Sequence, residues 1–139
     1  MTTTGVRTFD QSLETTREWL RDVQEEMGLD DEQRAFMVLR AVLQTLRDRL
    51  TIEETAHFAA QLPMLLQGVY YHGWTPKGKP EKIRDREEFL DRVAENLMRQ
   101  HDPEEACRAV FSVVERRMTG GEIEDIKGTL PEAIRELWP

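Results

Sequence analysis

Apolar positions along the chain recur at spacings of three and four residues, the period of one face of an α-helix. Charged residues separate the members of the first such stripe, which are Phe9, Leu13, Thr16, Leu20, Val23 and Met27. This spacing predicts a helix from about Thr8 to Met27. Trp19 lies beside the stripe, where it either widens the buried face or anchors a dimer.

Two further stretches repeat the pattern. The first, AFMVLRAVLQTLRDRL, carries apolar residues at Leu39, Val42, Leu43, Leu46 and Leu50. The second, EEFLDRVAENLM, carries them at Phe89, Leu90, Val93 and Leu97. No alternating pattern typical of strands competes with these stripes, so we predict an all-α protein built as a compact helical bundle.

Helix starts are marked by a capping residue followed three positions later by Glu or Gln, because the two side chains satisfy each other's backbone donors. The pairs are Thr8/Gln11, Thr51/Glu54, Asp85/Glu88, Thr119/Glu122 and Thr129/Glu132. Asp102 followed by Pro103 predicts one more start, since proline fits the first helical position.

The chain also carries an internal repeat, visible when Leu62-Pro63 is placed over Leu130-Pro131. In this alignment Leu39, Val42, Leu43, Leu46 and Leu50 fall on Cys107, Val110, Phe111, Val114 and Met118. We predict two similar multi-helix halves, about 8–71 and about 85–139, which share one domain over 1–139. Each half breaks at its Leu-Pro step, because proline inside a helix costs about 3 kcal/mol. The first step could instead lie in one kinked helix.

A connector at about 72–84 joins the halves, within the stretch GVYYHGWTPKGKPEK. Its glycines allow turns and its prolines stiffen the path, which favours a plain structural connector. Between His72 and Arg86, however, five Lys or Arg residues stand against two Asp or Glu residues. A basic, aromatic loop on an acidic body is also a candidate binding surface. The candidate contact residues are Tyr71, His72, Trp74, Lys77 and Lys79.

Several segments together carry a resemblance to a known family. They are LRAVLQTLRDRLTIEETAHFAAQLPMLLQGVYYHGWTP, EEFLDRV and ERRMTGGEIEDIKGTLPEAIRELW. With these segments the chain resembles an uncharacterised bacterial family classed only as a domain of unknown function. The resemblance covers nearly the whole chain and implies a bacterial two-repeat helical protein. It supplies no reaction, cofactor or catalytic residue.

Composition and charge narrow the classes of function. No apolar run approaches the roughly 20 residues that a membrane span needs, and we expect a cytoplasmic protein with no membrane contact. The single cysteine, Cys107, excludes an intrachain disulfide and a cysteine-clustered metal site. A net charge of -8 disfavours nucleic-acid binding.

A metal site is the most specific chemical candidate. Glu54 and His57 have the spacing that places two ligands on one helical face, and the repeat aligns them with Glu122 and Asp125. The competing interpretation is structural, because Glu54 and Glu122 also fit as capping-box partners. We therefore predict no cofactor and no catalytic residue.

These patterns favour a non-enzymatic helical protein-interaction module whose ligand is another protein or a second copy of the chain. The alternative is a small enzyme or a metal- or ligand-binding bundle with its pocket between the two halves.

Overall fold

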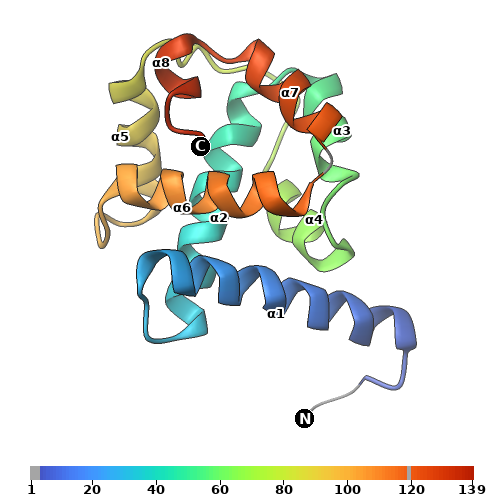
Figure 1. Cartoon of the computed structure of the whole chain (residues 1–139). Coiled ribbons are helices and arrows are strands. Elements are labelled where there is room, and N and C mark those ends of the chain that lie inside the picture. The colour runs from blue at the N-terminus through green and yellow to red at the C-terminus, as the bar shows by residue number, and fades with distance from the viewer. Residues whose placement is uncertain (1–3, 119) are drawn as a thin grey trace.

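The computed structural model describes residues 4–118 and 120–139 and forms eight helices within them (Figure 1). The helices are α1 (Arg7–Met27), α2 (Glu32–Arg49), α3 (Ile52–Ala59), α4 (Met64–Tyr71), α5 (Arg86–Asn96), α6 (Pro103–Arg117), α7 (Gly120–Thr129) and α8 (Glu132–Arg135). No strand occurs in these two ranges. The prediction of an all-α bundle is confirmed.

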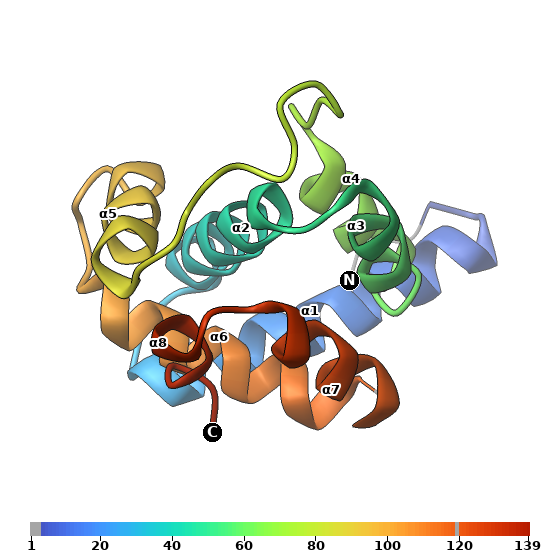
Figure 2. The same cartoon turned by 90° about the horizontal axis from the view of Figure 1, so that it is seen from above.

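Helix α2 lies at the centre of the bundle and contacts α1, α4, α5 and α6. In Figure 2 it runs between α5 on one side and α3 with α4 on the other. Its buried positions surround most of the helix, as expected of a helix with neighbours on several sides. They are Ala35, Val38, Leu39, Ala41, Val42, Leu43, Thr45, Leu46 and Arg47.

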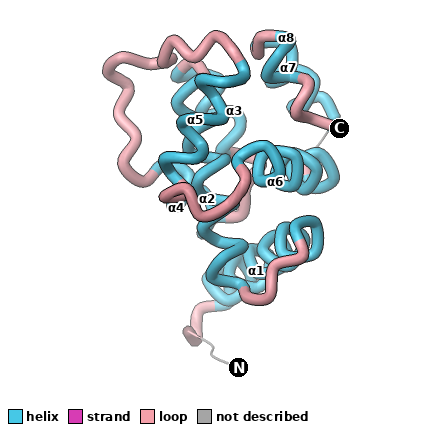
Figure 3. The backbone as a smooth tube through the Cα atoms, turned by 90° about the vertical axis from the view of Figure 1, so that its left-hand side faces the viewer, coloured by secondary structure: helices cyan, strands magenta, loops and turns pink. Residues whose placement is uncertain are grey.

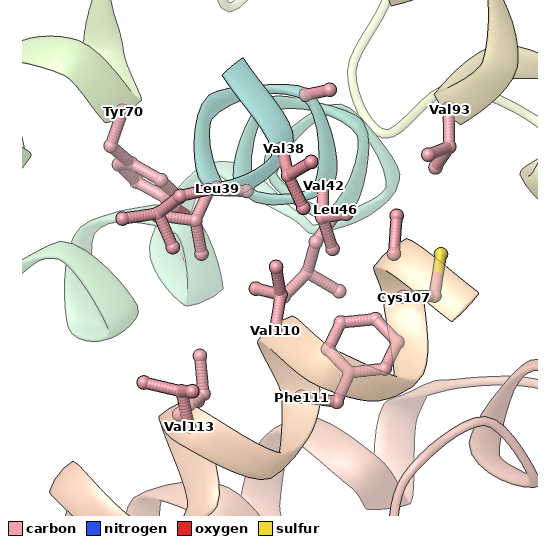
Figure 4. Packing of buried hydrophobic residues seen from close by; sticks show 14 of the residues in the cluster. Val38, Leu39, Val42, Leu46, Tyr70, Val93, Cys107, Val110, Phe111 and Val113 are labelled. Carbon is pink, nitrogen blue, oxygen red and sulfur yellow. The ribbon is translucent and has the colours of Figure 1, made fainter. Parts of the chain in front are cut away.

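The core joins α2 to α6. Figure 4 shows Val38, Val42 and Leu46 of α2 pointing toward Val110 of α6. One hydrophobic cluster contains these residues together with buried residues from each of the other helices. The stripes predicted for α2 and α5 are therefore buried, with Leu90 packed at the edge of the cluster.

Helix α1 forms where its stripe predicted it, but only part of that stripe is buried. Thr16, Trp19, Leu20 and Val23 are buried, whereas Phe9 and Leu13 are exposed. The expectation that Phe9 and Leu13 face the core is wrong, because α1 has 21 residues, about 31 Å, and its first turns extend past α4 and α6 in Figure 1. Trp19 is only 2% exposed, so it widens the buried face.

The predicted helix starts have mixed outcomes. Thr51 and Glu54 form both bonds of a capping box, and the Asp85 and Asp102 side chains cap α5 and α6. Thr8 is not a cap, since α1 begins at Arg7 after Val6. Thr129 is not the N-cap of α8 either.

Thr129 lies in the last turn of α7, where its hydroxyl donates to the carbonyl of Ile126 at 2.8 Å. Pro131 occupies the N-cap of α8 instead. The predicted start at Thr119 lies outside the described residues. One cap was missed: Asp31, whose carboxylate accepts from the backbone N–H of Arg34 at 2.8 Å.

Both Leu-Pro steps break the chain between two helices. Pro63 has φ −56° and ψ 149°, and Pro131 has φ −56° and ψ 147°, and each is the N-cap of the short helix that follows. Helix α3 ends at Ala59, so the alternative of one kinked helix in the first half is wrong. The internal repeat itself stays a prediction.

Candidate interaction surfaces

The connector is held by the last turn of α2. Arg47 is only 5% exposed, and its Nη1 donates to the carbonyls of Tyr70 at 2.7 Å and His72 at 3.0 Å. Its Nε donates to the Asp48 carboxylate at 2.9 Å. A buried guanidinium needs such partners, because an unpaired charge in the interior is costly. Arg47 therefore fixes the start of the connector.

The next two residues of α2 hold the far end of the connector. The carbonyl of Asp48 accepts from the backbone N–H of Glu81 at 2.8 Å, and Arg49 Nε donates to the carbonyl of Ile83 at 2.6 Å. Ile83 is itself buried in the core. Figure 3 shows the connector as a long loop on the outside of the helices, with both ends returning to them.

Three of the five predicted contact residues are engaged within the chain. Tyr71 packs edge-on against Tyr70 and Trp74, with ring centroids 5.3 and 5.9 Å apart. Trp74 is half-buried. The side chain of Lys79 is 9% exposed, and its Nζ lies 3.3 Å from Glu81.

His72 and Lys77 are the two predicted contact residues that are exposed to solvent. His72 begins the connector, where Arg47 binds its carbonyl, and Lys77 lies five residues further along the chain.

Two of the five basic residues between His72 and Arg86 are already paired, namely Lys79 and Arg86. Glu81 binds both Lys79 and Arg92, and Arg86 lies 2.5 Å from Glu104. Burial raises the pKa of Glu81, but the bonds and charges of Arg92 and Lys79 outweigh burial and hold that pKa below its usual range. The electrostatic argument for this loop as an anion-binding surface is therefore weaker than the sequence alone indicated.

The four weak candidates for metal ligands, Glu54, His57, Glu122 and Asp125, do not form a cluster. Helices α3 and α7 are neighbours, but Glu54 is engaged in the capping box and His57 and Asp125 are exposed. Glu122 is half-buried. Within residues 4–118 and 120–139, no three His, Cys, Asp or Glu side chains group closely enough to hold a metal ion.

Two titratable groups in the core serve packing. Burial raises the pKa of the Cys107 thiol well above its usual range, so the thiol stays protonated and acts as a small apolar side chain. Burial likewise raises the pKa of Tyr70, whose hydroxyl donates to the carbonyl of Thr55 at 3.1 Å.

A hollow of about 420 Å³ lies where α1, the α3–α4 turn and α6 meet, and it joins the first half of the chain to the second. Its lining includes Trp19, Leu62, Arg116 and Arg117. The two arginines are paired with three acidic residues of α1, namely Glu18, Asp22 and Glu26. This is the place that a pocket between the halves would take.

Exposed apolar side chains lie at the start of α1 and in the first turn of α4, and we call this set the α1–α4 strip. Its members are Val6, Phe9, Leu13, Met64 and Leu65. Phe9 is 55% and Met64 56% exposed. The two helices are joined here, because the backbone N–H of Leu65 donates to Ser12 Oγ at 2.8 Å. A hollow of about 300 Å³ lies between them.

Sequence reasoning missed this strip because a helical apolar stripe is normally buried. The available signal was length: the stripe from Phe9 to Met27 needs about 28 Å of partner surface, and the neighbouring helices are shorter. Met64 and Leu65 could be recognised as exposed only once α4 had been placed.

Taken together, the helices define an all-α bundle organised around α2. The chain belongs to the family of uncharacterized conserved proteins DUF2267, whose family model matches residues 16–137. This confirms the resemblance to a domain-of-unknown-function family. No curated protein matches the chain. In the part of the chain that the structure describes, none of the helices has the length and apolar character to cross a bilayer.

Proposed function

We propose that this protein is a non-enzymatic helical interaction module and that the α1–α4 strip binds a protein partner. The observation that carries the proposal is the exposure of Phe9 and Leu13, which continue the buried stripe of α1 at the same spacing. Large apolar side chains gathered on one surface mark interaction sites, and burying one such side chain fully contributes about 1.5–3 kcal/mol.

The shape of the strip supports a helical ligand. Two neighbouring helices contribute to it, and the hollow between them is lined by Pro63 and Met64 at the start of α4 and by the polar residues Thr8, Gln11, Ser12 and Thr15 of α1. An amphipathic helix docks into such a surface through apolar side chains spaced at three and four residues. The negative net charge favours a protein over a nucleic acid as ligand.

The exposed part of the connector is a second candidate contact for the same function. His72 and Lys77 are exposed there, while Tyr71, Trp74 and Lys79 support the loop from within. A small enzyme or ligand-binding bundle is the alternative function, with its pocket at the hollow beside Trp19. The pairing of Arg116 and Arg117 with α1 acids gives that hollow a structural role, which favours the interaction module.

Photo-crosslinking tests the proposal. We expect p-benzoylphenylalanine at position 9 to give a higher-mass protein adduct on irradiation of cells of the native host. The same group at position 52 is the matched control, because Ile52 is 51% exposed and lies outside the strip. The adduct should disappear when Leu13→Ser is added. No adduct at position 9, or equal adducts at both positions, would contradict the proposal.

A further inference from the structure

We infer that the occupant of the α1–α4 strip is a basic amphipathic helix of another protein. This inference rests on the proposed function, because it specifies the chemistry of the partner that the strip binds. It follows from the shape of the overhanging end of α1 and from the charges around the strip.

The first buried residue of α1 is Thr16, and residues 7–15 form the more exposed end of this helix, which Ser12 joins to the N–H of Leu65 on α4. We call residues 7–15 the overhang. Nine residues of helix span about 13 Å. Val6, Phe9 and Leu13 are spaced by three and four residues along it, the spacing that lets two helices pack along a seam. A partner helix of about three turns is long enough to cover this seam and to reach Met64 and Leu65 on α4.

Acidic groups flank only one side of the strip. Helix α4 has the sequence MLLQGVYY, so it places no charged side chain beside the strip. On the opposite side of the overhang lie Asp10 and Glu14, and the next cation, Arg17, is already bound by Glu32 at 2.7 Å. Arg7 lies three residues before Asp10 and seven before Glu14, on the same helical face, so this flank of the overhang carries a net charge of −1. A cation on this flank of the partner helix would therefore meet the Glu14 carboxylate, beside an Asp10 carboxylate that already accepts from the N–H and the hydroxyl of Thr4.

The whole chain strengthens this preference. Its net charge of -8 attracts basic ligands over distances of about a Debye length and steers their association. A second copy carries the same -8 and would bring its own Asp10 and Glu14 to the shared surface. Like charges placed together oppose association, so the electrostatics favours a different, basic protein over self-association.

The family match gives this surface a particular place in the chain. The family match begins at Thr16, which is also the first buried residue of α1. Phe9 and Leu13 therefore lie outside the matched residues, while Met64 and Leu65 lie within them.

Peptide binding to the purified full chain tests the inference by fluorescence anisotropy. The probe is a labelled 14-residue helical peptide with leucines at positions i, i+3, i+4 and i+7 and lysines on the flanks. One control peptide replaces every lysine with glutamate, and the other scrambles the lysine peptide so that the leucines no longer share a face. We expect the amphipathic lysine peptide to bind at least about tenfold more tightly than either control at low salt.

Variants locate the binding. Phe9→Ser and Met64→Ser should each weaken binding of the lysine peptide without a change in the circular dichroism spectrum, because both side chains are exposed in the folded chain. Ile52→Ser should leave binding unchanged. Asp10→Asn combined with Glu14→Gln should reduce the dependence of binding on salt.

Equal binding of the lysine and glutamate peptides, or of the amphipathic and scrambled ones, would overturn the inference. Sedimentation that shows a wild-type dimer lost in Phe9→Ser would overturn it in favour of a second copy. An adduct at position 9 without binding of the lysine peptide would leave the proposed function in place and remove only the basic partner.

Discussion

At the scale of single residues, Arg47 decides the path of the connector. Sequence analysis gave it no role, because an arginine on an amphipathic helix normally belongs to the solvated face. The fold buries it instead, since the backbone carbonyls of Tyr70 and His72 are brought to its guanidinium from residues 23 and 25 positions away. A charge pattern cannot predict acceptors so distant in the sequence.

Arg47→Met should lower the free energy of unfolding by about 2–4 kcal/mol, because it leaves two carbonyls and the Asp48 carboxylate without their donor. Urea denaturation measures the loss. Arg34→Met is the matched control: its ion pair with Asp31 is exposed, so the loss there should stay below about 1 kcal/mol. Equal losses in both variants would show that Arg47 has no special part in holding the connector.

At the scale of the elements, capping motifs give a sharp test of what local sequence can determine. The Thr51/Glu54 motif forms a complete capping box, with bonds of 3.1 Å from the Glu54 N–H to Thr51 Oγ1 and 2.9 Å from the Thr51 N–H to Glu54 Oε1. The Thr8/Gln11 motif has the same type of residues but lies inside α1. The pattern alone does not fix where a chain enters its helix.

Thr51→Ala should therefore cost about 1 kcal/mol in unfolding free energy, because α3 loses the acceptor for one of its first backbone donors. Thr8→Ala should cost nothing or stabilise slightly, since alanine is the better helix former at an exposed position. Thermal and urea unfolding of both variants provide the comparison. A loss at Thr8 as large as that at Thr51 would mean that α1 is capped there in solution.

At the scale of the whole molecule, the buried cluster draws residues from both halves of the chain. Leu46 of α2 and Val114 of α6 are aligned by the predicted repeat, and each is fully buried in that cluster. Helices α2 and α6 contact each other. A shared core of this kind supports the prediction of one domain over residues 1–139.

Leu46→Ala should destabilise the protein by about 2–5 kcal/mol, and Val114→Ala by less, because a smaller side chain is removed. In calorimetry both variants should shift one common transition to lower temperature. Two separate transitions, with each variant moving only one of them, would show that the halves are independent domains and that the prediction of a single domain is wrong.

Local sequence was enough to predict the helical class, the buried faces of α2 and α5 and the break at Leu130-Pro131, whereas at Leu62-Pro63 it left a kinked helix open. It could do so because helical periodicity and the geometry of proline act within a few residues. It also identified the connector, but it could not separate the exposed His72 and Lys77 from the supporting Tyr71, Trp74 and Lys79.

Only the tertiary structure decided which part of the α1 stripe is covered, how Arg47 is used and where the exposed apolar surface lies. Phe9 and Leu20 belong to the same apolar stripe, but Phe9 is exposed and Leu20 is buried, because other helices pack only against the part of α1 that contains Leu20. Burial depends on neighbours that come from distant parts of the chain, and those neighbours end before α1 does. The strip proposed as the binding surface is therefore a product of helix length and packing, which no local pattern encodes.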